Sequence, residues 1–95
     1  MAPSYSQCDA LRVRHARDED LDQLDSLLED LRRFPALREK KRGNFYRGSR
    51  AFVHFHADPS GLYADVRLAE EFERLRVSTK QEQRLLLRRI GAVLE

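Results

Sequence analysis

The chain has 95 residues, of which 41% are apolar and 36% are charged, and its net charge is +2. This size and composition are typical of one small globular domain, and a transmembrane protein is excluded because no apolar run approaches the roughly 20 residues of a membrane span. The polar start MAPSYSQC lacks the apolar core of a secretory signal, and the single cysteine, Cys8, cannot form an internal disulfide. We therefore expect a cytoplasmic protein without a membrane partner.

Residues 1–9 are expected to form a disordered tail, and residues 10–95 a single domain. The alternation of apolar and basic residues over 11–14 indicates a short edge strand. A helix is expected over residues 18–33, because leucines recur there at helical spacing and Pro35 follows. The leucines of this stripe are Leu21, Leu24, Leu27, Leu28 and Leu31.

Residues 36–50 have no clear hydrophobic period and contain two glycines, so we expect them to be mostly loop. The next stretch, 51–68, alternates apolar and polar residues and predicts a β-hairpin. Its turn is expected at residues 58–61, where the sequence DPSG has the residues of a type I turn. A further strand is expected over residues 72–77.

A capping box that begins at Ser78, or the same box one residue later at Thr79, indicates the start of the last helix. Together these elements predict an α+β fold: an antiparallel sheet of three to four strands with two helices packed on one face, in the order (β)-α-β-β-β-α. Period two along the hairpin gives an apolar face with Phe55 opposite Ala64. This apolar face is expected to pack against both helices.

The opposite face of the predicted sheet is polar and is the candidate functional surface. In the expected registers, His54 lies opposite Asp65, and Asp65 lies opposite Arg76. His56 lies opposite Tyr63. Two aromatic side chains and three arginines share this face with the histidines, a combination that suits base stacking and phosphate contact. The face consists of Phe52, His54, His56, Tyr63, Asp65, Arg67, Arg74 and Arg76.

The histidines and Asp65 allow three interpretations. The first is cross-strand pairing on a sheet surface, in which Asp65 raises the pKa of His54. The second is acid–base catalysis, with His54, His56 and Asp65 as the candidate catalytic residues. The third is a metal site formed by both histidines with Asp58 or Asp65. Because no cysteine or known spacing motif accompanies the histidines, we predict no metal site and no cofactor.

Charge is segregated along the chain. Residues 18–30 carry seven acidic side chains and no basic one, whereas residues 38–50 carry six basic side chains against Glu39. Such segregation can steer an anionic partner, and the alternative is that the two stretches neutralise each other. The candidate binding residues are Lys40, Lys41 and Arg42 of the basic segment and Phe52, Tyr63, Arg67, Arg74 and Arg76 of the sheet face. The candidate partners are a nucleic acid, another anion, or a second copy of the chain in a homodimer.

Three resemblances to known families bear on function. The stretch NFYRGSRAFVHFHADPSGLYADVRL resembles the central segment of small bacterial proteins that carry an F-x-H-F-H hairpin, and this resemblance implies no known activity. The sequence LRVRHARDEDLDQLDSLLEDL resembles the opening strand and helix of the acetyl-CoA-dependent N-acetyltransferases, whose later Gly-rich loop has no counterpart here. The predicted order of elements resembles that of the messenger-RNA-cleaving toxins of bacterial toxin–antitoxin modules.

From these observations we expect a non-enzymatic binding or interaction protein, whose partner is an anionic ligand, a nucleic acid or a second copy of itself. The alternative, which the toxin resemblance implies, is a metal-independent ribonuclease. In that enzyme His54 or His56 would transfer protons, and Arg67, Arg74 and Arg76 would stabilise charge.

Overall fold

The computed structural model describes residues 14–94, which form a six-stranded antiparallel sheet and three helices. The α+β class is therefore confirmed, although there are more strands and one more helix than predicted. The predicted tail, residues 1–9, and residues 11–13 of the predicted edge strand lie outside the described residues. The elements are β1 (Arg14–His15), α2 (Asp18–Asp22), α3 (Asp25–Arg32), β2 (Leu37–Lys41), β3 (Asn44–Arg47), β4 (Arg50–Asp58), β5 (Gly61–Val66), β6 (Glu73–Arg76) and α4 (Lys80–Leu94).

The strands follow the order β2-β3-β4-β5-β6, and β1 also pairs with β4. Because β5 pairs along one edge of β4 over residues 53–58, β1 and β3 share the other edge. On that edge β3 pairs with residues 50–53 and β1 with residues 56–57. The N–H of Ala16, directly after β1, donates to the carbonyl oxygen of Phe55 at 3.1 Å, so the notch that remains between β3 and β1 lies beside His54 of β4.

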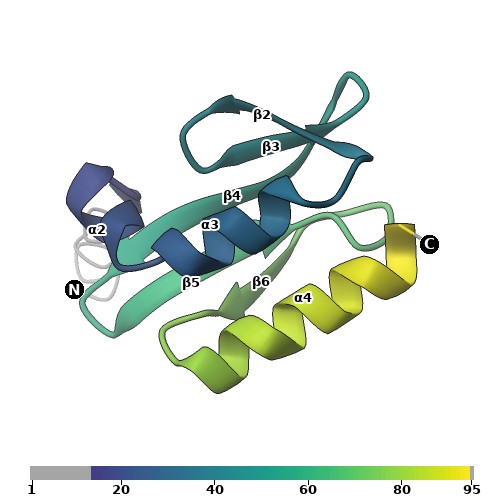
Figure 1. Cartoon of the computed structure of the whole chain (residues 1–95). Coiled ribbons are helices and arrows are strands. Elements are labelled where there is room, and N and C mark those ends of the chain that lie inside the picture. The colour runs from purple at the N-terminus through teal and green to yellow at the C-terminus, as the bar shows by residue number, and fades with distance from the viewer. Residues whose placement is uncertain (1–13, 95) are drawn as a thin grey trace, which may run out of the picture.

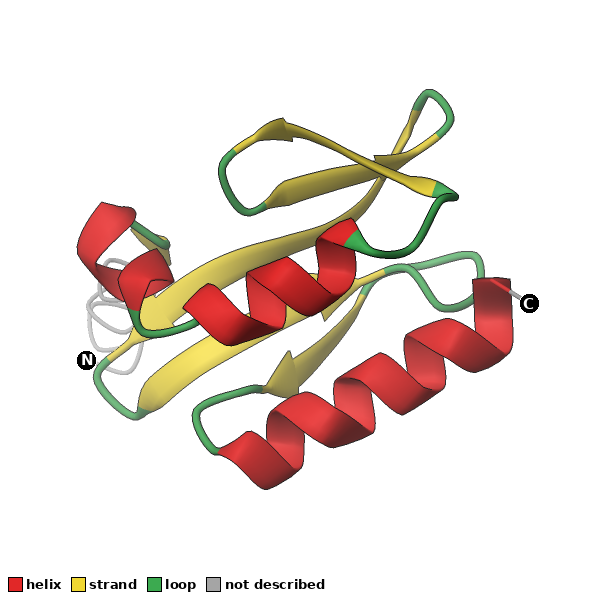
Figure 2. Ribbon diagram, in the orientation of Figure 1, coloured by secondary structure: helices red, strands yellow, loops and turns green. Residues whose placement is uncertain are grey.

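The helices α3 and α4 lie side by side across one face of the sheet (Figures 1 and 2). Under them, the predicted apolar face of the hairpin forms the core: Phe55 is 3% exposed and stands opposite Ala64, which is fully buried. The predicted β4–β5 register is confirmed throughout, including His54 opposite Asp65. Among the described residues, no helix has the length and apolar character needed to cross a membrane.

The first predicted helix, residues 18–33, is two helices. Leu24 separates α2 from α3 with φ −105° and ψ 16°, which is not a helical conformation. The carboxylate of Asp20 holds α2 in place, because it accepts hydrogen bonds from the backbone N–H of Arg17 at 2.9 Å and from the side chain of Arg14 at 2.7 Å. Leucine spacing does not reveal this break, since the leucines on both sides of it are buried.

The segment predicted as mostly loop, residues 36–50, instead contains the β2–β3 hairpin. Its buried apolar side chains are Leu37 and Phe45, so a strand period is not visible in the sequence. Gly43 makes the turn with φ +83°, and its N–H donates to the carboxylate of Glu39 at 2.9 Å. The predicted strand count was therefore too low because charged residues dominate this hairpin.

The β5–β6 register differs from the prediction by two residues. Asp65 lies opposite Arg74 rather than Arg76, and Tyr63 lies opposite Arg76. The cause is a connection over residues 67–72 that is longer than the four-residue turn expected. A shift of two preserves the faces, because side chains alternate with period two.

Phe52, predicted on the polar face, is buried in the core with 2% exposure. A β-bulge explains the difference: Tyr46 pairs with Ala51 and Phe45 with Val53, so Phe52 is an extra residue on β4. Strict alternation fails at this point, and both Phe52 and Val53 enter the core. The prediction of Phe52 as an exposed binding residue is therefore wrong.

The last helix begins with the second of the two predicted capping boxes. The N–H of Glu82 donates to Thr79 Oγ1 at 3.1 Å, and the N–H of Thr79 donates to the Glu82 carboxylate at 3.0 Å. Ser78 has another role, because its hydroxyl accepts the N–H of Leu62 at 2.8 Å and joins the helix start to β5.

Candidate metal centre

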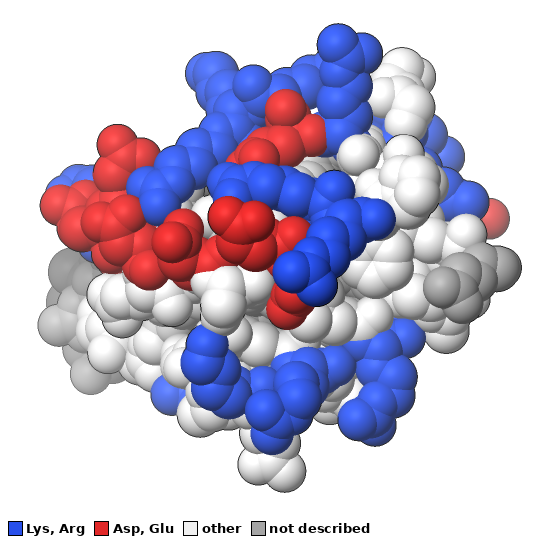
Figure 3. Space-filling view, in the orientation of Figure 1, with Lys and Arg blue, Asp and Glu red and all other residues white. Residues whose placement is uncertain are grey.

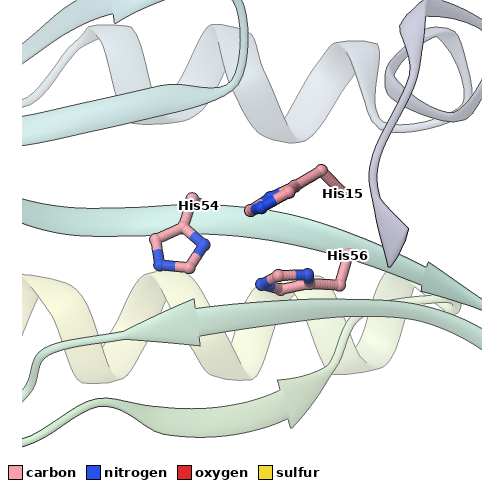
Figure 4. Close-up of side chains that lie close together, drawn as sticks. All are labelled: His15, His54 and His56. Atoms are coloured by element: carbon pink, nitrogen blue, oxygen red, sulfur yellow. The ribbon is translucent and has the colours of Figure 1, made fainter. Parts of the chain in front are cut away.

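All three histidines of the chain lie together on the face of the sheet opposite to the helices (Figure 4). His54 and His56 project from β4 on the same side, and β1 brings His15 opposite His56. The ring centroids are 4.8 Å apart for His15 and His56, 5.0 Å for His54 and His56, and 6.2 Å for His15 and His54. One ring nitrogen from each residue lies within 4.8 Å of the other two.

The ring of His54 contains a polar atom with no partner. Its Nδ1 is buried and makes no hydrogen bond. Leaving such an atom unpaired costs about 1–3 kcal/mol, so a buried unsatisfied nitrogen in a cluster of imidazoles needs a functional explanation. A metal ion provides one, because the lone pair of a neutral imidazole can bind it.

Asp65 holds the ring of His56 from the side. Its Oδ2 lies 3.0 Å from His56 Nε2, a short contact that lacks the geometry of a hydrogen bond. Arg74 in turn donates two hydrogen bonds to Asp65, at 2.7 and 2.9 Å. The predicted row of His54, Asp65 and Arg76 is therefore a row of His56, Asp65 and Arg74. A carboxylate this close to one imidazole nitrogen resembles the outer shell of carboxylate–histidine–metal sites, in which the histidine binds the metal ion through its other nitrogen.

The protonation states suit metal binding. Burial lowers the pKa of both His54 and His56, and it outweighs the attraction of Asp65. The predicted rise in the pKa of His54 is therefore wrong. Burial alone would raise the pKa of Asp65, but the hydrogen bonds from Arg74 and the charges around it hold that pKa below its ordinary value. Neutral imidazoles beside an ionised carboxylate are the forms that coordination requires.

The cluster is wider than a loaded zinc site. Histidine nitrogens at 2.0–2.1 Å from a tetrahedral zinc ion are about 3.3 Å apart. The ring nitrogens of the three histidines lie up to 4.8 Å apart, so metal binding requires the most distant two to approach each other by up to about 1.5 Å. Rotation of the exposed His15 side chain can supply that movement. Three imidazoles suit Zn²⁺, Ni²⁺ or Cu²⁺, and three protein ligands leave a fourth tetrahedral position for another molecule.

Phe72 and Arg67 border the cluster beside His54. The Phe72 ring lies 5.0 Å from the His54 ring in an edge-on arrangement, and the Arg67 guanidinium lies 4.4 Å above Phe72. Arg67 also donates to the backbone oxygens of Ala51 and Glu70. This predicted binding residue therefore has a structural role that closes one side of the site.

Two further residues of the predicted face lie outside the histidine cluster. Tyr63 shares a hydrogen bond of 2.7 Å with the hydroxyl of Ser60 in the hairpin turn. Arg76 pairs with Glu82 of α4 at 3.1 Å. Their contacts connect the turn, the sheet and α4, and they bring neither side chain to the histidines.

The basic segment is partly neutralised. Figure 3 shows its side chains beside the acidic side chains of α2 and α3. Arg42 contacts three carboxylates, and the Lys40 ammonium lies 4.3 Å from the centre of the Tyr46 ring. The partners of Arg42 are Asp18 at 3.3 Å, Asp22 at 2.8 Å and Asp25 at 3.6 Å. Lys41 makes no ion pair within residues 14–94. Arg42 therefore fits the alternative stated above, in which the acidic and basic stretches of the chain neutralise each other.

Sequence reasoning identified two of the three histidines and missed His15. His54 and His56 share a strand, whereas His15 belongs to a two-residue strand far away in the sequence. The signal that could have pointed to His15 is the number of histidines: the chain has only three, and all of them converge.

Comparisons with known proteins add no assignment: no family model matches the chain, and neither a curated protein nor a solved structure matches it.

Proposed function

We propose that this protein binds a divalent transition-metal ion, with Zn²⁺ as the first candidate, through His15, His54 and His56. The observation that carries the proposal is the convergence of all three imidazoles around a buried His54 nitrogen that has no partner. Asp65 supports the site by orienting His56, and Arg74 supports Asp65. The protein is then a binding module for a cation, whereas the sequence led us to expect an anionic ligand, a nucleic acid or a second copy, and no metal site.

The direct experiment is titration of the untagged protein with Co²⁺ and Zn²⁺. Co²⁺ should bind with one-to-one stoichiometry and develop the visible absorption of tetrahedral cobalt, and Zn²⁺ should displace it. Single substitutions His15→Asn, His54→Asn and His56→Asn should each weaken binding more than 100-fold, because loss of a ligand exceeds the 10–100-fold effect of losing a supporting residue.

Two carboxylate variants separate a specific site from general attraction of cations. Asp65→Asn should weaken Zn²⁺ binding by about 10–100-fold. Asp22→Asn, on the exposed side of α2, should leave it unchanged. Binding that survives all three histidine substitutions, or that responds equally to both carboxylate variants, would disprove the proposed site.

Nucleic-acid binding, a homodimer and the metal-independent ribonuclease stay predictions. The contacts of Arg42 weaken the first, since a phosphate would have to displace carboxylates that this side chain already contacts. The ribonuclease would use His54 and His56 as free acid–base groups, which a bound metal ion would prevent.

A further inference from the structure

A pocket adjoins the histidine cluster at the notch between β3 and β1. It has a volume of about 180 Å³. His15 and His54 line it directly, so two of the three proposed metal ligands form one of its walls. The remaining walls come from Asn44, Phe45, Tyr46, Ala51 and Val53.

The pocket exists because the strand pairing at this edge of β4 is interrupted. On one side of the interruption, Phe45 pairs with Val53, and on the other, His15 pairs with His56. Between these pairs no strand of the described chain covers His54 on this edge. A molecule bound at the notch would therefore contact the sheet between two strands and reach the metal position from the side.

The chemistry of the walls selects a particular kind of ligand. Ala51 and the Tyr46 ring are half-buried and give the pocket an apolar surface, whereas Phe45 and Val53 are each 1% exposed and close the pocket on the side of the core. The size is close to that of protein cavities, about 150 Å³, that bind a single benzene ring. Asn44 contributes the amide group at the edge of this surface.

The charge at the site favours an anion. Three neutral imidazoles leave the positive charge of a bound divalent ion uncompensated. The nearest carboxylate, Asp65, is already engaged by Arg74. Lys40 places a second positive charge over the Tyr46 ring.

We infer that the proposed metal ion, on which this inference rests, takes a small carboxylate with a compact apolar body as its fourth ligand. One carboxylate oxygen completes the tetrahedral coordination. The apolar body, of the size of one aromatic ring, lies in the notch against Ala51 and the Tyr46 ring. The site is therefore a receptor for a small aromatic or branched aliphatic carboxylate.

The test uses the Co²⁺-loaded protein, with benzoate, acetate and benzyl alcohol as probes. Benzoate should change the visible spectrum of the cobalt and bind at least tenfold more tightly than acetate, because only benzoate fills the pocket. Benzyl alcohol has the ring but no negative charge, and it should bind at least tenfold more weakly than benzoate.

Ala51→Leu fills the pocket without removing a metal ligand. It should preserve Co²⁺ binding and abolish the preference for benzoate over acetate. The matched control is Ala92→Leu on the exposed side of α4, which should change neither. Equal binding of benzoate and acetate, or a preference that survives Ala51→Leu, would overturn the inference while the metal site stands. Failure of Co²⁺ to bind the three histidines would instead overturn the proposed function.

Discussion

Phe55→Ala should destabilise the metal-free protein strongly. The Phe55 side chain is 3% exposed, and across the strands it faces Ala64, which has no side-chain atoms beyond Cβ to fill a cavity. A buried Phe→Ala substitution costs about 3–5 kcal/mol, a large part of the roughly 5–15 kcal/mol that stabilises a small domain. At about 4–8 °C for each kcal/mol, the melting temperature should fall by roughly 12–40 °C.

The matched control is Phe72→Ala, which removes the same atoms from a residue that is 38% exposed. Phe72 contacts His54 and Arg67 at the surface, so its loss should cost about 1 kcal/mol. Urea unfolding followed by circular dichroism measures both free energies under one set of conditions. Equal losses for the two variants, or a loss below 1 kcal/mol for Phe55→Ala, would show that the helix-covered face does not carry Phe55.

The remaining predictions concern pH and the turn glycines. Since His54 and His56 have lower pKa values in the folded protein than in the unfolded chain, the unfolded chain binds more protons below about pH 6.5. The unfolding free energy of the metal-free protein should therefore fall with decreasing pH in that range, by at most about 2.7 kcal/mol per pH unit for two protons. A flat profile in denaturant titrations between pH 7 and 5 would contradict this. Gly48→Ala should cost about 1–2 kcal/mol because φ is +64° with open space around Cβ, and Gly43→Ala should cost more, because its Cβ would lie 2.9 Å from Leu21 Cδ2. Thermal melts that rank the two glycine variants the other way would contradict the role of the Leu21 contact.

The fold was predictable where the hydrophobic pattern was strong. From Val53 of β4 to Val66 of β5, apolar residues alternate with polar ones on each strand, and one register buries Phe55 against Ala64, so the fold class, the two faces and the pairing of these strands were predictable. The β2–β3 hairpin buries Leu37 and Phe45 among charged residues, and its pattern was too sparse to identify. The bulge at Phe52 was hidden for another reason: it depends on how β3 pairs with β4, and the sequence of β4 does not contain that information.

The candidate site was predictable in part. Local periodicity placed His54, His56 and Asp65 on one face, and the register around the hairpin turn made them neighbours. His15 comes from the other end of the fold through a pairing of two residues, and no local pattern reports such a pairing. The direction of the pKa shift of His54 also needed the structure, because burial lowers this pKa and the charge of Asp65 raises it. The sequence supplies the charge but not the degree of burial.

The shortness of β1 gives the proposed metal ion a mechanical consequence. β1 has two residues, and few hydrogen bonds hold it to β4. An ion that joins His15 to His54 would act as a reversible cross-link between residues about 40 positions apart, and because only the folded chain brings these ligands together, metal binding would stabilise the folded state. The metal would then fasten the beginning of the described chain to its central strand, so that loss of the ion would loosen α2 as well as empty the site.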